Sequence, residues 1–564
     1  MTRQLPNVLF RWGVLSVLLV IIGCPIVFFI WGSFWTTAPG LGGTATLRGY
    51  QELFSPQVYS TLGNTVAVAV SGTAIALVLG VGGVVVTTKT DIVGRRLIAP
   101  AFLVQYFLPS YILALSWQFY AGPKGPVNQV LLALPMFDAP PVDIFSVWGI
   151  ALVSGSHYAG IVYLLTKGAI ESVPASLEEA AEISGAGLLT TLRKITLPLA
   201  SPSLLIATVI VFTRLLQSFG TPLILGIRGG VFVLATQMYL ALRGYPYDFT
   251  FAAALGMILL LIAVFGVAAQ RRLSGAREKY ETIAGQGNVT TAEYDLGRYG
   301  HVLSAVFLAL IVFLYLLPVV TLVASSFQQT FLGFDLEHVE WTLENYLHFF
   351  VGSSAETFRL ALKNTLLLSG VGGVVGMVLA ALVSYIVIKT ESVVGDVLDF
   401  LTFVPIVIPG LVLSTAYLWF FLNFNVFGLY GTIWLVMIAF TAKFIVYGVR
   451  ASNSSFRSIG QELEDAANIA GAGLFGTFKR VFIPLLKPGL VSGYLLLFID
   501  YMKSLSIPLL LGAGNAEVIQ VLMWRRIANG NAEQSAAIAT IIVALILVVY
   551  VGTYLLTDVA VTDI

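Results

Sequence analysis

Two polar segments of this sequence share one arrangement of acidic, small and basic residues. They run from Ser176 to Pro202 and from Gln461 to Lys487. In each, an acid precedes Ala-Ala, a glycine follows four residues after the second alanine, and a basic pair leads to a hydrophobic-x-hydrophobic-Pro ending. Such residues offer ionic and close-packing contacts. The pattern predicts a short helix, a glycine break and a second helix at a membrane surface.

The two segments are in register at a constant separation of 286 positions. The residues of interest in the two copies are Glu178, Glu179, Ala180, Ala181, Gly185 and Pro198, and then Glu464, Asp465, Ala466, Ala467, Gly471 and Pro484. Ser176 with Glu179 forms a capping-box pattern, so Ser176 is the predicted N-cap of the first helix. Pro198 is expected to open the hydrophobic segment that follows.

A second group of polar residues lies inside apolar segments. Arg214 and Asp500 occupy equivalent positions, again 286 apart, and Lys503 follows Asp500 by one helical turn. Charges inside a bilayer are costly and normally face a bundle interior or a wet cavity. One hypothesis is that they line a translocation path, together with Gln217, Ser218 and Ser504 at i, i+3 and i+4 spacing. The other is a buried Arg214–Asp500 pair that holds two parts of the chain together.

Two further polar residues lie within predicted spans. His157 is expected to make a structural hydrogen bond between helices rather than to bind a metal. Lys443 has no evident partner in the sequence. The remaining histidines are scattered, the lone Cys24 lies in an apolar run, and neither an H-E-x-x-H nor a G-x-x-x-x-G-K-[ST] motif occurs. We therefore expect no metal or catalytic site and no cofactor on this chain, and any ATP and Mg²⁺ to bind another subunit.

Composition identifies the class of protein. Of the 564 residues, 58% are hydrophobic and 10% charged, and the mean hydropathy is +0.91. These values exclude an ordinary soluble domain and predict an all-α polytopic membrane protein. A net charge of +1 gives no indication of nucleic acid as a partner. The apolar run after Arg11 is expected to be a retained first span, because no small-x-small cleavage site follows it.

Apolar runs long enough to cross a bilayer number six in each half of the chain. They lie near 12–33, 63–87, 98–120, 144–166, 202–225 and 249–270, and near 302–325, 364–388, 398–421, 427–449, 488–511 and 535–556. Other equivalences support a duplication: Lys89-Thr90 and Pro109 recur as Lys389-Thr390 and Pro409, 300 positions later. Because each half has an even number of spans, we predict a parallel repeat with a pseudo-two-fold axis along the membrane normal.

The distribution of lysine and arginine predicts the orientation. With the N-terminus inside, inner segments hold 19 of these residues and outer segments hold 8, so both repeated loops and both termini are expected in the cytoplasm. The predicted domains are a first half, 1–270, with its loop at 172–200; a cytoplasmic linker, 271–300; and a second half, 301–564, with its loop at 458–486.

The repeated E-A-A-x3-G-x9-I-x-L-P pattern resembles the cytoplasmic loop of permease subunits in binding-protein-dependent ABC importers. The first copy matches throughout, and the second has Asp465, Val481 and Ile483 in place of Glu, Ile and Leu. In that family the loop is a coupling helix that docks on the ATP-hydrolysing subunit, so the resemblance implies that the loop residues named above contact such a subunit. The resemblance covers nearly the whole chain as two fused six-helix halves. Such fusion looks most like the iron(III) importers, and it is also seen in thiamine, phosphonate and related permeases of the family. The alternative substrates are therefore thiamine, phosphonate and polyamine.

The resemblance implies a transport subunit, not an enzyme, in a bacterial or archaeal cytoplasmic (inner) membrane. Its implied partners are the lipid bilayer, two ATP-binding subunits and an extracytoplasmic substrate-binding protein, and its implied mechanism is alternating access. A gradient-driven secondary transporter with parallel repeats is an alternative, although it gives no reason for two matching acidic loops. A channel-like or scaffolding membrane protein is the other, and it predicts no associated ATPase.

Overall fold

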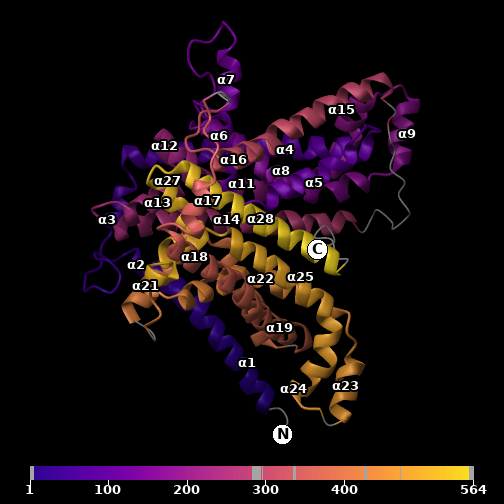
Figure 1. The fold of residues 1–564 in the computed structure, drawn as a ribbon. Coiled ribbons are helices and arrows are strands. Elements are labelled where there is room, and N and C mark those ends of the chain that lie inside the picture. The colour runs from indigo at the N-terminus through magenta and orange to yellow at the C-terminus, as the bar shows by residue number, and fades with distance from the viewer. Residues whose placement is uncertain are drawn as a thin grey trace. The chain divides into compact units, whose positions relative to one another are not determined.

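The computed structural model describes residues 5–281, 294, 296–333, 338–390, 392–424, 428–470 and 472–557. Regular structure in these ranges is helical (Figure 1). The helices up to residue 281 are α1 (Leu5–Leu18), η1 (Leu19–Gly23), α2 (Cys24–Gly32), α3 (Arg48–Glu52), α4 (Pro56–Lys89), α5 (Arg95–Phe107), α6 (Ser110–Ala121), α7 (Pro126–Leu132), α8 (Val147–Glu171), α9 (Ala175–Ile183), α10 (Leu188–Thr191), η2 (Leu192–Thr196), α11 (Leu197–Leu216), η3 (Pro222–Gly226), α12 (Ile227–Gly229), α13 (Leu234–Arg243) and α14 (Phe249–Glu281).

The later helices repeat much of this order. They are α15 (Arg298–Ile311), η4 (Val312–Leu316), α16 (Leu317–Ser326), α17 (Glu344–Phe350), α18 (Ala355–Leu367), η5 (Leu368–Gly372), α19 (Gly373–Lys389), α20 (Val393–Val407), α21 (Gly410–Phe424), α22 (Ile433–Arg457), α23 (Gln461–Ile469), α24 (Leu474–Thr477), η7 (Phe478–Phe482), α25 (Ile483–Lys503), α26 (Ser506–Leu511), η8 (Gly514–Ala516), α27 (Ile519–Ala528) and α28 (Ala532–Thr557). Ten helices in the described ranges are long and apolar enough to cross a membrane, or up to 13 spans if each of three bent pairs is one span. The predicted all-helical, multi-span fold is confirmed.

The predicted spans at 98–120 and 398–421 are bent helix pairs rather than straight helices. The chain bends by 107° between α5 and the segment Ser110–Leu132, which contains α6 and α7, and by 112° between α20 and α21. The residue before each proline, Leu108 or Ile408, has an extended backbone, because the ring of Pro109 or Pro409 disfavours a helical conformation there. The two prolines that are equivalent in sequence therefore break equivalent helices.

The predicted spans at 202–225 and 488–511 begin and end earlier than expected. The fifth span of the first half is Leu188–Leu216, and its counterpart is Phe478–Lys503. In both, a π-helical turn precedes a proline at the start of the long helix: η2 before Pro198, and η7 before Pro484. Proline has no N–H for the usual helical bond, and a wider turn accommodates it. After α11, a further pair of helices, Pro222–Gly229 and Leu234–Arg243, bends by 79°.

The chain packs into two compact units that do not coincide with its sequence halves. One contains Met1–Glu52, Ala241–Leu260 and Tyr346–Ile564, and the other Leu53–Leu240 and Leu261–Asn345. The first spanning segment of each half thus packs with helices of the other half.

Contacts between particular side chains stabilise the packing of each first span against the helices of the other half. The Tyr417 hydroxyl of α21 donates to the Ile21 carbonyl at 2.5 Å, and Gly32 of α2 lies directly against the Trp419 ring. In the other unit Tyr315 of η4 packs edge-on against Phe102 of α5. Buried aromatic side chains therefore fix each exchanged segment.

Candidate coupling loops and intramembrane polar groups

The first repeated loop folds as predicted, with one correction at its start. Helix α9 begins at Ala175 with Pro174 as N-cap and no side-chain cap, so the prediction that Ser176 is the N-cap is wrong. Proline has no N–H to donate, so it suits a position at the start of a helix, where no intrahelical acceptor is available, and is unfavourable in the helix interior. Gly185 ends the helix with φ +85°, a left-handed conformation that glycine adopts readily. The predicted glycine break is thus confirmed.

The free face of α9 is partly apolar. Ile183 is 88% exposed and Leu177 45% exposed, and Glu179 and Ala180 are exposed beside them, with Ala181 half-buried. In the second loop the equivalent Ile469 and Leu463 are 88% and 47% exposed, although that loop lies in the other unit. Figure 1 places α9 at one end of its helices, and α23 with α24 at the end of theirs. Two apolar side chains exposed at the same positions in both loops indicate a surface that a partner covers.

Glu178 lies on the opposite face of α9 and is buried. Its Oε2 pairs with Lys89 Nζ at 2.7 Å, and both side chains are 0% exposed. Its Oε1 accepts a hydrogen bond from the Thr196 hydroxyl at 2.7 Å. Sequence analysis grouped Glu178 with the contact residues of the loop; in the structure its carboxylate faces α4 and η2, and Glu179 faces outward. Lys89, at the end of α4, was missed as a partner because nothing in the sequence relates it to residue 178.

The second loop is described in less detail. Its helix α23, Gln461–Ile469, matches the prediction, with Ala466 exposed, Ala467 half-buried and Pro484 exposed, like Pro198. Gly471 and the side chains of Glu464 and Asp465 lie outside the described residues. Lys389, the equivalent of Lys89, donates from Nζ to the Ile459 carbonyl at 2.6 Å.

Two of the predicted intramembrane charges form an ion pair on one helix. Lys503 Nζ lies 2.8 Å from Asp500 Oδ1, and the Asp500 side chain is 11% exposed. Arg214 is in the last turn of α11 and is exposed. It belongs to the other compact unit, so the Arg214–Asp500 pair stays a hypothesis. Asp500 already has a partner in Lys503, which keeps this buried carboxylate paired.

The helical spacing argument for the polar residues beside these charges is wrong. Helix α11 ends at Leu216, with Gln217 as C-cap and Ser218 beyond it, and α25 ends at Lys503, with Ser504 as C-cap. The i+3 and i+4 relation therefore does not place these three residues on a helix face. Gln217, Ser218 and Ser504 are half-buried where each chain leaves its helix, and their place on a translocation path stays a prediction.

Lys443, for which the sequence offers no evident partner, contacts backbone carbonyls in the structure. Its Nζ donates to the carbonyls of Pro405 at 2.8 Å and Ile406 at 3.3 Å, and to that of Ile408. These are the last carbonyls before the bend between α20 and α21. A cation is favourable there because a helix C-terminus carries unpaired carbonyls and partial negative charge.

The first half has a related contact at the equivalent position. His157, 286 residues before Lys443, lies with Nδ1 3.1 Å from the carbonyl oxygen of Gln105 near the end of α5. The predicted interhelical hydrogen bond of His157 is thus confirmed. Both halves therefore support their broken helix from the neighbouring span with a nitrogen donor, and the 286-residue repeat could have indicated this relation.

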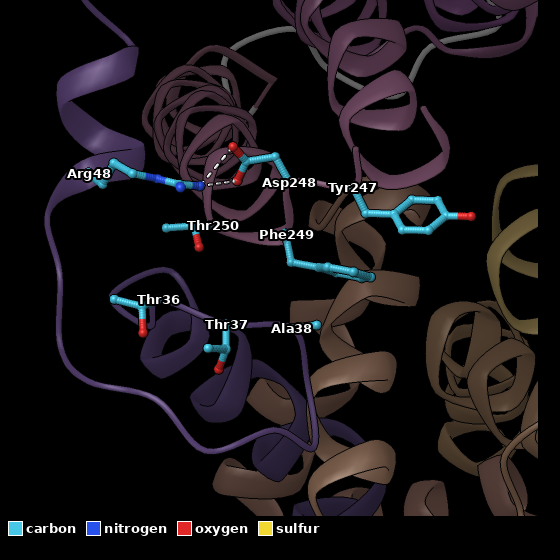
Figure 2. Close-up of a pocket in the computed structure, with 8 residues that line it drawn as sticks. All are labelled: Thr36, Thr37, Ala38, Arg48, Tyr247, Asp248, Phe249 and Thr250. Carbon is cyan, nitrogen blue, oxygen red and sulfur yellow. Dashed lines mark hydrogen bonds and ion pairs between the residues drawn. The ribbon is translucent and has the colours of Figure 1, made fainter. Parts of the chain in front are cut away.

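A pocket of about 270 Å³ lies beside the segment that follows α2 (Figure 2). In its wall a single guanidinium nitrogen of Arg48, Nη2, donates to both carboxylate oxygens of Asp248, at 2.7 Å and 2.8 Å. The Thr250 hydroxyl donates to the Trp35 carbonyl at 2.8 Å. These polar groups form hydrogen bonds with one another, so the pocket wall connects the segment after α2 to the start of α14.

Comparison with known proteins identifies the family. The model of the family described as "Binding-protein-dependent transport system inner membrane component" matches twice, over residues 80–276 and 372–561, which together exceed half of the chain. The chain belongs to this family. The permease is therefore a multi-pass, non-catalytic transport subunit with two tandem copies of the family domain. Among its described residues no group of three His, Cys, Asp or Glu is placed to hold a metal ion.

Individual relatives are distant. The permease is 26% identical over 407 residues to the ferric transport system permease protein FbpB of Actinobacillus pleuropneumoniae, covering 71% of this chain and 57% of that one. It thus spans little more than half of that relative. It is 21% identical over 544 residues to the Fe(3+)-transport system permease protein FbpB 2 of Haemophilus influenzae, covering 95% and 96%. A chain of a solved bacterial alginate ABC transporter aligns with a TM-score of 0.34 and 21% identity, covering 40% of this chain and 81% of that one.

Proposed function

We propose that this permease imports iron(III), delivered by an extracytoplasmic binding protein and driven by two ATP-binding subunits on the opposite side of the membrane. The single observation that supports ATPase docking most is the repeated exposed face of the loops, in which Ile183 and Ile469 are each 88% exposed. An apolar side chain so exposed at the tip of a polar loop indicates a contact that forms in a complex. Glu179 beside it, and Asp465 by sequence equivalence, add charges that orient the docking.

The proposed mechanism is alternating access. Closure of the ATPases draws the two loops together and opens the permease to the outside, and hydrolysis returns it to the inward-open state. The two halves form a parallel repeat, which presents both loops to one ATPase dimer, with both termini on the same, cytoplasmic side. Arg214, Asp500 and Lys503, with Gln217, Ser218 and Ser504, are proposed to line the path. Charges near a bilayer centre ordinarily mark such paths.

Iron(III) is proposed as cargo because permeases named for ferric transport match most of the chain, one of them over 95% of its length. In this proposal iron is a substrate that passes through, and no resident metal site is required. Thiamine, phosphonate and polyamine are competing cargoes, since membership of the family does not by itself select iron(III). A gradient-driven carrier is the rival mechanism, because parallel repeats and intramembrane charges also occur in secondary transporters.

The test is reconstitution in liposomes with the cognate ATPase and binding protein. Radioactive iron(III) bound to the binding protein should enter only when ATP is present on the ATPase side, and unlabelled iron(III) should compete where thiamine, 2-aminoethylphosphonate and spermidine do not. The double variant Glu179→Lys with Asp465→Lys should lose bound ATPase. Failure of the wild-type permease to bind any ATPase would overturn the importer assignment, whereas ATP-driven uptake of another solute would overturn iron alone.

A further inference from the structure

The buried ion pair between Lys89 and Glu178 has a role that the proposed function does not explain. We propose that Lys89 is a positioning residue of the coupling mechanism, which holds α9 and the end of α4 together as one moving body through Glu178. This inference rests on the proposed function, because it concerns how displacement of the loop by the ATPase reaches the membrane helices. It assigns Glu178 to the transmission of that displacement, and leaves docking to Glu179.

One carboxylate fastens three elements. Glu178 is in the first turn of α9, Lys89 is the last residue of α4, and Thr196 is the last residue of η2, directly before α11. The Lys89 and Thr196 contacts are both 2.7 Å. The charges also suit their helices, since an acid lies at the N-terminus of α9 and a base at the C-terminus of α4.

Burial makes this connection stiff. Both side chains are 0% exposed, so removing either partner would leave the other charge unpaired in a site away from water, which is strongly unfavourable. The nearby pair Lys167–Glu171 differs, since its atoms are 3.8 Å apart and its side chains are 44% and 42% exposed. Water can replace each partner in such a pair, and it contributes little. It therefore serves as a matched control.

The equivalent lysine of the second half also contacts the chain beside its loop helix. Lys389 ends its helix, α19, and its Nζ donates to the carbonyl of Ile459, which lies between α22 and α23. Lys89 thus holds the loop helix of the first half, and Lys389 holds the segment that leads into the loop helix of the second.

The direct test measures whether α9 and α4 move together. In the permease–ATPase complex in nanodiscs, with Cys24→Ser, spin labels are placed at Ser176→Cys on α9 and Val78→Cys on α4, both exposed. The distance between the labels should be the same without nucleotide and with trapped ATP in the wild-type background. In Lys89→Met it should change or broaden when ATP is trapped, and Lys167→Met should behave like the wild type. A Lys89→Met distance that stays fixed would overturn the proposal.

A second readout separates coupling from stability. The ratio of iron(III) transported to ATP hydrolysed is measured on equal amounts of assembled complex. It should fall on the order of fivefold or more in Lys89→Met and Glu178→Gln, and Lys89→Arg should retain most of it. A structural role alone would reduce the amount of complex and leave the ratio unchanged, which would refute the proposal.

A further variant distinguishes failure of this inference from failure of the proposed function. If Lys89→Met does not assemble, the double variant Lys89→Met with Glu178→Met removes both charges, a change that buried pairs often tolerate. It should assemble with a low ratio and a nucleotide-dependent label distance, and wild-type values for both would overturn the inference. Failure of the proposed function appears instead in the wild-type permease, as no bound ATPase and no effect of ATP on either readout.

Discussion

Lys443 offers the sharpest test of how the bend between α20 and α21 is held. Replacing it with methionine keeps a side chain of similar length and removes the ammonium group that contacts the carbonyls of Pro405, Ile406 and Ile408. The carbonyls at the end of a helix have no partner within the helix, and Pro409 supplies no N–H. The variant should therefore loosen the last turn of α20.

The expected magnitude follows from these contacts. A hydrogen bond to a charged group contributes about 1.5–3 kcal/mol, and a cation at a partly buried helix C-terminus up to about 2 kcal/mol. The two effects overlap, so we expect the last turn to lose about 2–4 kcal/mol of protection against local opening. Since about 1.4 kcal/mol corresponds to a factor of ten, amide hydrogen exchange there should quicken roughly 30- to 800-fold.

The assay is hydrogen exchange with mass spectrometry on the permease in nanodiscs, followed on peptides covering 393–424. Lys443→Arg should exchange much like the wild type, because guanidinium retains the charge and several donors. The control is Lys487→Met, which removes an exposed lysine from α25. Unchanged exchange in Lys443→Met, within about threefold of the wild type, would refute the role of Lys443 in holding the bend.

Three further outcomes are expected. Gly185→Ala should cost about 1–2 kcal/mol at φ +85° and lower the amount of ATPase that co-purifies; an unchanged amount would count against a rigid loop. Gly32→Ala places a Cβ 2.3 Å from the Trp419 ring and should cost about 1–3 kcal/mol, seen as a lower Tm than Gly13→Ala, which meets no atom within 4 Å; equal Tm values would contradict the exchanged packing. Burial raises the pKa of Glu517, which neighbouring arginines only partly offset, so its ionisation destabilises the fold as pH rises. Glu517→Gln should therefore raise Tm at about pH 8 and lose this advantage towards about pH 5; an advantage that grows on acidification would contradict the shift.

Repetition and hydropathy were sufficient to predict the class of fold and the two loops. Spacing alone related Pro109 to Pro409, and the structure shows that each breaks a helix. Hydropathy, however, predicted straight spans over these prolines, because averaging over a window cannot distinguish a crossing helix from two short helices that meet at an angle. The ends of α11 and α25 were misplaced for the same reason, since the apolar run continues beyond the helix.

The exchange of the first helices could not be predicted. A helix exposed to lipid is apolar on all faces, so the composition of α1 and α2 does not identify α20 and α21 as the helices that they contact. Their packing depends on shape, as where Gly32 admits the Trp419 ring. A pattern of small residues next to aromatic ones can suggest a close approach, but it does not identify the partner.

The two acidic residues of the first loop differ in the direction in which their side chains point, and the sequence alone does not give this direction. Glu178 and Glu179 are adjacent and chemically identical, but successive residues in a helix point about 100° apart. One carboxylate is consequently buried against Lys89, and the other is free at the surface. A pattern match alone assigns both to docking. Under the proposed function, we infer that the exposed acid takes part in docking and the buried acid in transmission, because docking needs a side chain that a partner can reach, and transmission needs one that is held in place.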